Sequence, residues 1–68
     1  MSKGKVKYFN DQKGWGIIQC YDTEQDVYVH HSAINMQGYR TLREGQEVMC
    51  DVSQTEQGPK AQNVKLLN

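Results

Sequence analysis

The chain contains 68 residues, of which 37% are hydrophobic, and its eight Lys and Arg residues are balanced by eight Asp and Glu residues. A chain of this length buries only about 60% of the surface that its unfolded form exposes, so we expect one small domain with a thin core. A formal net charge of zero excludes a uniformly basic surface. Any attraction for a polyanion must therefore come from a local cluster of cations.

No stretch approaches the roughly 20 consecutive apolar residues of a membrane-spanning helix, and the residues after Met1 do not resemble an apolar signal region. We therefore expect a cytoplasmic protein without a membrane partner. Cys20 and Cys50 lie far apart in the sequence and form no CxxC motif. In the cytosol this pattern favours reduced core thiols over a disulfide.

The hydrophobic pattern repeats every second residue and is interrupted by turn-forming residues about every 8–12 positions, which is typical of short β-strands. Strands are predicted over residues 3–9, 13–20, 26–31, 46–53 and 61–67. A single helical turn is expected over 32–34, and Gly58 and Pro59 are expected to break the chain before the last strand. Five short antiparallel strands cover one another best as a small closed or nearly closed barrel.

One face of these strands is apolar and predicts the core. Strict alternation points the following residues inward: Val6, Ile18, Cys20, Val27, Val29, Val48, Cys50, Val52, Val64 and Leu66. The end of the first strand is ambiguous, because alternation would turn Tyr8 inward and Phe9 outward unless a β-bulge intervenes.

The opposite face gathers aromatic rings. Lys13, Trp15 and Ile17 alternate with two glycines in one strand, and Tyr28 and His30 point outward from the next. A hairpin of the two strands places all five on one surface. The bases of single-stranded nucleic acid stack on such rings whatever their sequence, at roughly 1–3 kcal/mol per base.

Charged residues accompany the rings. The cations expected to follow the phosphates are Lys7, Lys13, Arg40 and Lys60, and Asp26 is placed to accept a hydrogen bond from a base amino group. Most of the other carboxylates fall in loops or on the fourth strand. The charges are thus segregated although they sum to zero.

These segments resemble the bacterial cold-shock proteins from residue 4 to about residue 64. Residues 4–10 (GKVKYFN) are similar to the opening strand of that family, 13–18 (KGWGII) to its first ribonucleoprotein motif and 27–31 (VYVHH) to its second. The resemblance implies a single cold-shock domain over 1–68, all-β, with a five-stranded antiparallel OB-fold barrel. It also implies a non-catalytic chaperone that binds single-stranded RNA and DNA, limits RNA secondary structure and thereby modulates transcription and translation. We expect it to act as a monomer.

Carried over by position, the resemblance assigns the nucleic-acid-binding surface to Lys7, Tyr8, Phe9, Asn10, Lys13, Trp15, Ile17, Asp26, Tyr28, His30, His31, Tyr39, Gln57 and Lys60. Tyr8 stands where the family usually carries tryptophan, and Trp15 stands where it carries phenylalanine. Ile17 replaces a phenylalanine and removes a stacking ring, and Gln57 replaces a residue that is often basic. Because each stacked base contributes about 1–3 kcal/mol, we expect weaker binding than in a typical member.

Other classes of function find less support in the sequence. Cys20, Cys50, His30 and His31 could supply zinc ligands, but adjacent strand residues point to opposite faces and no paired short spacing exists. No nucleophile or carboxylate is placed beside His30 to make it a general base, so we expect no enzyme, no metal, no cofactor and no small-molecule substrate. The alternative is a small protein-interaction module whose aromatic groove takes a peptide. The net charge of zero favours that alternative, and the lysines beside the rings oppose it.

Overall fold

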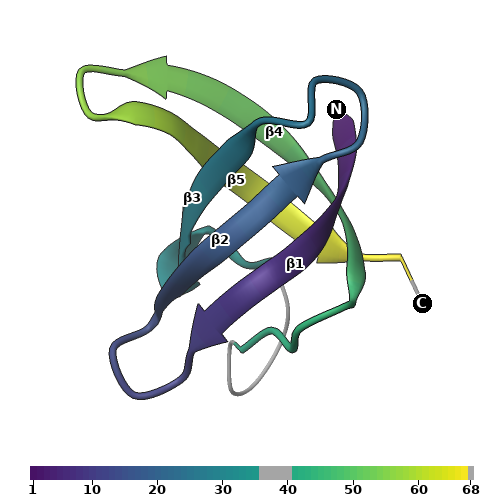
Figure 1. Cartoon of the computed structure of the whole chain (residues 1–68). Coiled ribbons are helices and arrows are strands. Elements are labelled where there is room, and N and C mark those ends of the chain that lie inside the picture. The colour runs from purple at the N-terminus through teal and green to yellow at the C-terminus, as the bar shows by residue number, and fades with distance from the viewer. Residues whose placement is uncertain (36–40, 68) are drawn as a thin grey trace.

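The computed structural model describes residues 1–35 and 41–67. Within these residues the chain forms the strands β1 (Ser2–Asn10), β2 (Trp15–Cys20), β3 (Asp26–His30), β4 (Glu47–Thr55) and β5 (Gly58–Leu66), with one 3-10 turn, η1 (His31–Ala33). The strands form a closed barrel in the order β1-β2-β3-β5-β4 (Figure 1). The predicted all-β barrel is confirmed.

Antiparallel ladders join all neighbouring strands except one pair. Among the described residues, β3 and β5 meet in parallel through a single residue pair, Tyr28 and Lys60. The ladder between β4 and β5 is much longer, running from Val48–Leu66 to Thr55–Gly58, and the two strands form a hairpin that extends beyond the barrel (Figure 1). The barrel is therefore closed at one place by a short parallel contact, which the sequence did not predict.

Two β-bulges set which side chains face inward. The register of β1 against β2 shifts between Val6 and Tyr8, so Lys7 and Tyr8 are both exposed and Phe9 packs against the core. The alternation that would have turned Tyr8 inward is thus broken by the extra residue.

In β5 the register against β4 shifts beside Asn63, which has a positive φ of 53°. As a result Ala61 and Val64 are both buried although they lie three positions apart.

The core contains the aliphatic and thiol side chains that the alternation predicts. Its fully buried members include Val6, Ile18, Val27, Val29, Val48 and Val64. Val52 and Leu66 are only partly buried and pack against its edge. Leu42 is buried, as its apolar character indicated, whereas Ile34 and Ala61 were not among the predicted core residues and are buried. Cys20 and Cys50 are free thiols in this core, as the sequence indicated.

Several predicted boundaries are wrong, and three of them fall near the candidate site or in the last hairpin. Lys13 lies in the turn before β2 and not in the strand, and His31 belongs to η1 and not to β3. Gly58 and Pro59 do not break the chain before β5, because that strand begins at Gly58, directly after the tight turn of the β4–β5 hairpin. Each error falls at a strand end, where local sequence constrains the backbone least.

Candidate nucleic-acid interface

The aromatic residues of β1, β2 and β3 lie on one outer surface of the barrel. Tyr8 pairs with Ile17, and Ile17 pairs with Tyr28, so these side chains form one row across the three strands. Trp15, which pairs with Asn10 and His30, lies in the next row. We call the surface made by Tyr8, Trp15, Ile17 and Tyr28 the stacking face.

Trp15 is held between two tyrosines. Its ring centroid lies 6.0 Å from that of Tyr28 with an interplanar angle of 23°, and 5.7 Å from that of Tyr8 at 60°. Trp15 is therefore half-buried by its neighbours and does not stand clear of the surface, whereas Tyr8 is 41% exposed. Offset and tilted ring pairs of this kind fix the orientation of the rings and leave faces open to a further ring.

Gly16 allows β1 and β2 to approach closely beneath the stacking face. A Cβ at this position would overlap the Tyr8 carbonyl oxygen and come within 2.7 Å of the Phe9 Cα. The close approach is needed beside the bulge in β1, where Tyr8 is turned outward. Gly16 therefore allows the backbone of Tyr8 to lie where its ring joins the stacking face.

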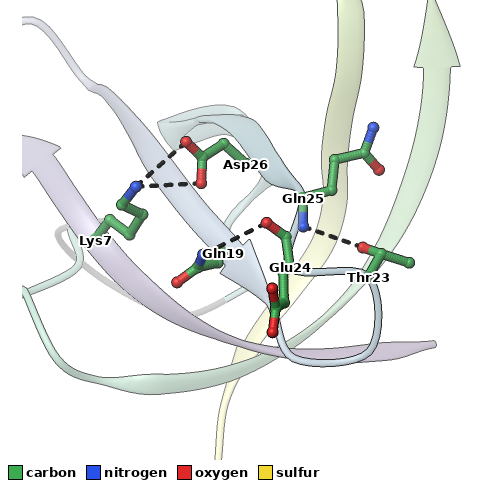
Figure 2. Close-up of polar contacts among 6 residues, drawn as sticks. All are labelled: Lys7, Gln19, Thr23, Glu24, Gln25 and Asp26. Atoms are coloured by element: carbon green, nitrogen blue, oxygen red, sulfur yellow. Dashed lines mark hydrogen bonds and ion pairs between the residues drawn. The ribbon is translucent and has the colours of Figure 1, made fainter.

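Lys7 is paired with a carboxylate at the edge of this surface. Its Nζ atom lies 3.3 Å from both carboxylate oxygens of Asp26, and both side chains are about half exposed. Lys7 belongs to β1 and Asp26 to β3, so the pair reaches across β2 beside Gln19 (Figure 2). The predicted phosphate-binding cation and the predicted base acceptor thus bind each other.

The turn that carries Asp26 is itself ordered by local hydrogen bonds. The Gln19 side-chain amide donates to the Glu24 carbonyl oxygen at 3.4 Å, and the Gln25 backbone N–H donates to the Thr23 hydroxyl at 3.2 Å (Figure 2). Hydrogen bonds of this kind satisfy backbone groups in turns. They fix the start of β3 and, with it, the position of the Asp26 carboxylate.

Two further lysines lie at other edges of the stacking face. Lys60 places its Nζ 5.7 Å from the centroid of the Tyr28 ring, a cation–π distance. Lys13 is exposed in the turn that follows β1. The Asn10 side-chain oxygen accepts hydrogen bonds from the backbone N–H groups of Gln12 and Lys13 at 3.0 and 2.9 Å, which orders this turn.

The two histidines form a pair at the end of β3. Their ring centroids lie 4.3 Å apart with an interplanar angle of 36°. His30 Nδ1 accepts a hydrogen bond from the backbone N–H of Ser32 and lies 2.9 Å from its hydroxyl, so His30 caps η1. His31 packs over Gly14, whose φ of 78° requires a glycine. The single helical turn predicted over 32–34 is present but begins one residue earlier, at His31.

The remaining predicted site residues lie beneath the stacking face, in the β4–β5 turn, or outside the described part of the chain. Phe9 is turned toward the core. Gln57 is exposed in the β4–β5 turn, where it lines a hollow of about 250 Å³ with Tyr28, Pro59 and Lys60. Tyr39 and Arg40 lie outside the described residues.

A larger hollow of about 740 Å³ is also lined by Tyr28 and Lys60. It is lined in part by Ser32, Asn35 and Gln62, none of which was predicted to be a site residue. A regular strand pattern gives no signal for them, because they meet only through the packing of η1 against β5.

The histidine and cysteine side chains of the described residues do not form a common metal site. Among the described residues, no group of three or more His, Cys, Asp or Glu side chains is arranged to hold a metal ion. Burial raises the pKa of the Cys50 thiol to about 11, with a smaller contribution from the neighbouring Cys20 thiol. Burial, followed by the charge of Asp22, also raises the pKa of Cys20. Zinc binds the thiolate, so these environments oppose it.

The described residues also contain no helix that is long and apolar enough to cross a membrane.

Strand order, barrel closure and an aromatic face on the first three strands define an OB-fold. The sequence profile of the family described as "'Cold-shock' DNA-binding domain" matches residues 2–67. The chain belongs to the cold-shock domain family, which is a family of nucleic-acid-binding proteins.

Individual relatives agree over nearly the whole chain. The chain is 52% identical over 65 residues to the cold shock-like protein CspA of Stigmatella aurantiaca, covering 96% of each chain. It is also 52% identical over 64 residues to the cold shock-like protein CspB of Bacillus cereus, covering 94% of this chain and 97% of the relative. Among solved structures, Drosophila Unr CSD456 superposes with a TM-score of 0.81 at 19% identity, covering 98% of this chain and 26% of that one. This last likeness concerns the fold alone.

Proposed function

We propose that this protein binds single-stranded RNA and DNA without catalysing a reaction, and acts as a chaperone that keeps RNA from folding on itself. The observation that carries the proposal is the stacking face, in which Trp15 lies between Tyr8 and Tyr28 on one outer surface. Bases have flat faces that stack on such rings without regard to sequence. In a duplex those faces are already stacked on one another, so the stacking face selects single strands.

The cations around the rings supply the electrostatic part of the binding free energy. Lys7, Lys13 and Lys60 lie at different edges of the stacking face, where they can follow the phosphates of a strand laid across it. Each phosphate contact on a single strand contributes about 0.7 to the slope of log K against log salt. Three to four contacts, counting Arg40, predict a slope of magnitude roughly 2–3.

The assigned surface consists of Lys7, Tyr8, Phe9, Asn10, Lys13, Trp15, Ile17, Asp26, Tyr28, His30, His31, Tyr39, Gln57 and Lys60. Within it, the rings stack on bases and the lysines bind phosphates. Phe9 supports the surface from beneath, and Asn10 orders the turn that carries Lys13. One monomeric domain over 1–68, acting in the cytoplasm, is sufficient for this binding. By holding RNA single-stranded the protein would modulate transcription and translation.

Fluorescence of Trp15, the single tryptophan of the chain, tests the proposal. Short single-stranded RNA and DNA should quench it at low salt, and a duplex of the same sequence should compete poorly. Unchanged fluorescence over a wide range of strand concentration would refute binding at the stacking face. A signal that does not respond to salt would favour the peptide-binding alternative, because an uncharged groove lacks the counterion term.

A further inference from the structure

The larger hollow is a gap in the wall of the barrel between two points of contact. At one end β3 meets β5 through Tyr28 and Lys60, and at the other Ile34 pairs in parallel with Val64. Beside the second contact, the Asn35 backbone N–H donates to the Val64 carbonyl oxygen at 2.7 Å. Between the two contacts the chain turns through η1 and leaves β5. We call the resulting space of about 740 Å³ the β3–β5 hollow.

The lining of the β3–β5 hollow is mostly polar, with a smaller apolar part. Ile34 and Ala61 line it and are each only 3% exposed. The rim is formed by one hydroxyl and several carboxamides, those of Ser32, Asn35, Gln62 and Asn63. Tyr28, His30 and Lys60 line its mouth, so the β3–β5 hollow opens directly from the stacking face.

Two of the rim carboxamides are available to a ligand. The Ser32 hydroxyl lies at 2.9 Å from His30 Nδ1, and the Asn63 amide donates to an Asp51 carboxylate oxygen at 3.0 Å. Within residues 1–35 and 41–67, by contrast, the side chains of Asn35 and Gln62 make no hydrogen bond. Both are exposed on the rim and each offers a donor and an acceptor.

We propose that the β3–β5 hollow takes one base of the bound single strand, turned away from the stacking face, and reads its edge through the carboxamides of Asn35 and Gln62. This inference rests on the proposed function, because the base belongs to the strand that the stacking face holds. A nucleobase has a polar edge and apolar faces, which match the carboxamide rim and the smaller apolar part of the lining. Carboxamides pair with base edges because their adjacent donor and acceptor match those of the base.

The surroundings favour a nucleotide over other ligands. Lys60 lies over the Tyr28 ring and also lines the β3–β5 hollow, so a phosphate bound there lies between a stacked base and an inserted one. The volume falls within the range of roughly 300–1,000 Å³ typical of small-ligand sites, and is ample for one base. Stacking alone is tolerant of sequence, whereas the β3–β5 hollow adds a preference among bases.

The test compares short homopolymers of dA, dC and dT bound to the wild-type chain and to Gln62→Ala and Asn35→Ala variants. Affinity is measured by tryptophan quenching, and far-ultraviolet circular dichroism verifies the fold. The expected result is a loss that differs by about 5-fold or more between bases, since a good pairing of this type discriminates by roughly that factor or more. Gln54→Ala is the matched control, because Gln54 is an exposed glutamine on β4 that lines neither hollow.

Equal losses for all three homopolymers, or losses no larger than that of Gln54→Ala, would overturn the inference while leaving the proposed function intact. Failure of the wild-type chain to bind any strand would instead overturn the proposed function. If Gln62→Ala is unfolded, Gln62→Met keeps the length of the side chain and removes its amide. A second measurement follows the side-chain NH₂ resonances of Asn35 and Gln62 by nuclear magnetic resonance during titration with the best-bound homopolymer. Both should shift, and unshifted resonances at saturation would contradict the proposal.

Discussion

The ion pair between Lys7 and Asp26 predicts that removing a carboxylate will strengthen binding. A phosphate has to displace Asp26 from Lys7, because the Nζ atom lies 3.3 Å from both carboxylate oxygens. Both side chains are about half exposed, and an ion pair in such a setting contributes about 0.2–1 kcal/mol. Asp26→Asn should therefore raise affinity about 1.4- to 5-fold at low salt.

The salt dependence and the stability provide separate measurements of the same change. Because the phosphate contact of Lys7 is already counted in the slope of roughly 2–3, the magnitude of the log–log salt slope should change by less than about 0.7. The free energy of unfolding should fall by no more than about 1 kcal/mol, since the lost pair is solvent-exposed. Tryptophan quenching titrations at several salt concentrations and a urea unfolding curve supply these quantities.

Two controls isolate the pair from the change in net charge. Glu44→Gln removes one negative charge in the exposed turn before β4 and leaves the pair intact, so its effect on affinity should be much smaller. In a Lys7→Gln background, Asp26→Asn should lose most of its effect, as in a double-mutant cycle. An Asp26→Asn chain that binds no more tightly than the wild type would refute the reasoning and indicate that the contact of Asp26 with the strand outweighs its competition for Lys7.

Three further outcomes are expected. Ile17→Phe adds a ring at a half-buried position, so strand affinity measured by tryptophan quenching should rise by up to about tenfold with little change in thermal stability. Unaltered affinity would count against stacking at this position. Gly16→Ala should lower the free energy of unfolding in urea by about 1–3 kcal/mol, because its Cβ overlaps backbone atoms of Tyr8 and Phe9; an unshifted midpoint would contradict this close approach. Cys50 has a folded-state pKa of about 11 against an ordinary value of 9.0, so its stabilisation is complete below pH 9 and is lost as the pH rises toward 11. Unfolding curves across that range should show a decline that Cys50→Val reduces, and equal declines in both proteins would exclude this thiol as a source.

The barrel and most of its core were predictable because they follow from alternation alone. Ile18, Val27, Val29 and Val48 lie on regular stretches of strand and are buried as the pattern indicates. Tyr8 could not be placed in this way, because its direction depends on a bulge that forms only against β2.

The same limit applies to β5. Ala61 is buried because the bulge at Asn63 turns its side chain to the inner face of β5. The only local indication of this bulge in the sequence is Asn63 itself, a residue type that tolerates positive φ. Strand ends and bulges thus account for the differences in strand bounds and in the direction of side chains on the strands.

The stacking face was predictable and its surroundings were not. Trp15 and Tyr28 alternate with core residues, so their common surface follows from the hairpin. The pairing of Lys7 with Asp26 and the exposure of Asn35 and Gln62 around the β3–β5 hollow depend on contacts between strands remote in sequence. Local pattern carries no information about such contacts.

The short parallel contact between Tyr28 and Lys60 joins two parts of the barrel that are each formed by strands adjacent in sequence. β1, β2 and β3 form a meander of neighbours in sequence, and β4 and β5 form a long hairpin. Among the described residues, β3 pairs with β5 through one residue pair only. The two residues of that pair lie far apart in the sequence. During folding we expect this non-local pair to form after the pairs between strands adjacent in sequence. Under the proposed function, a bound strand lying across Tyr28 and reaching Lys60 would contact both parts of the barrel and would stabilise the folded domain against unfolding.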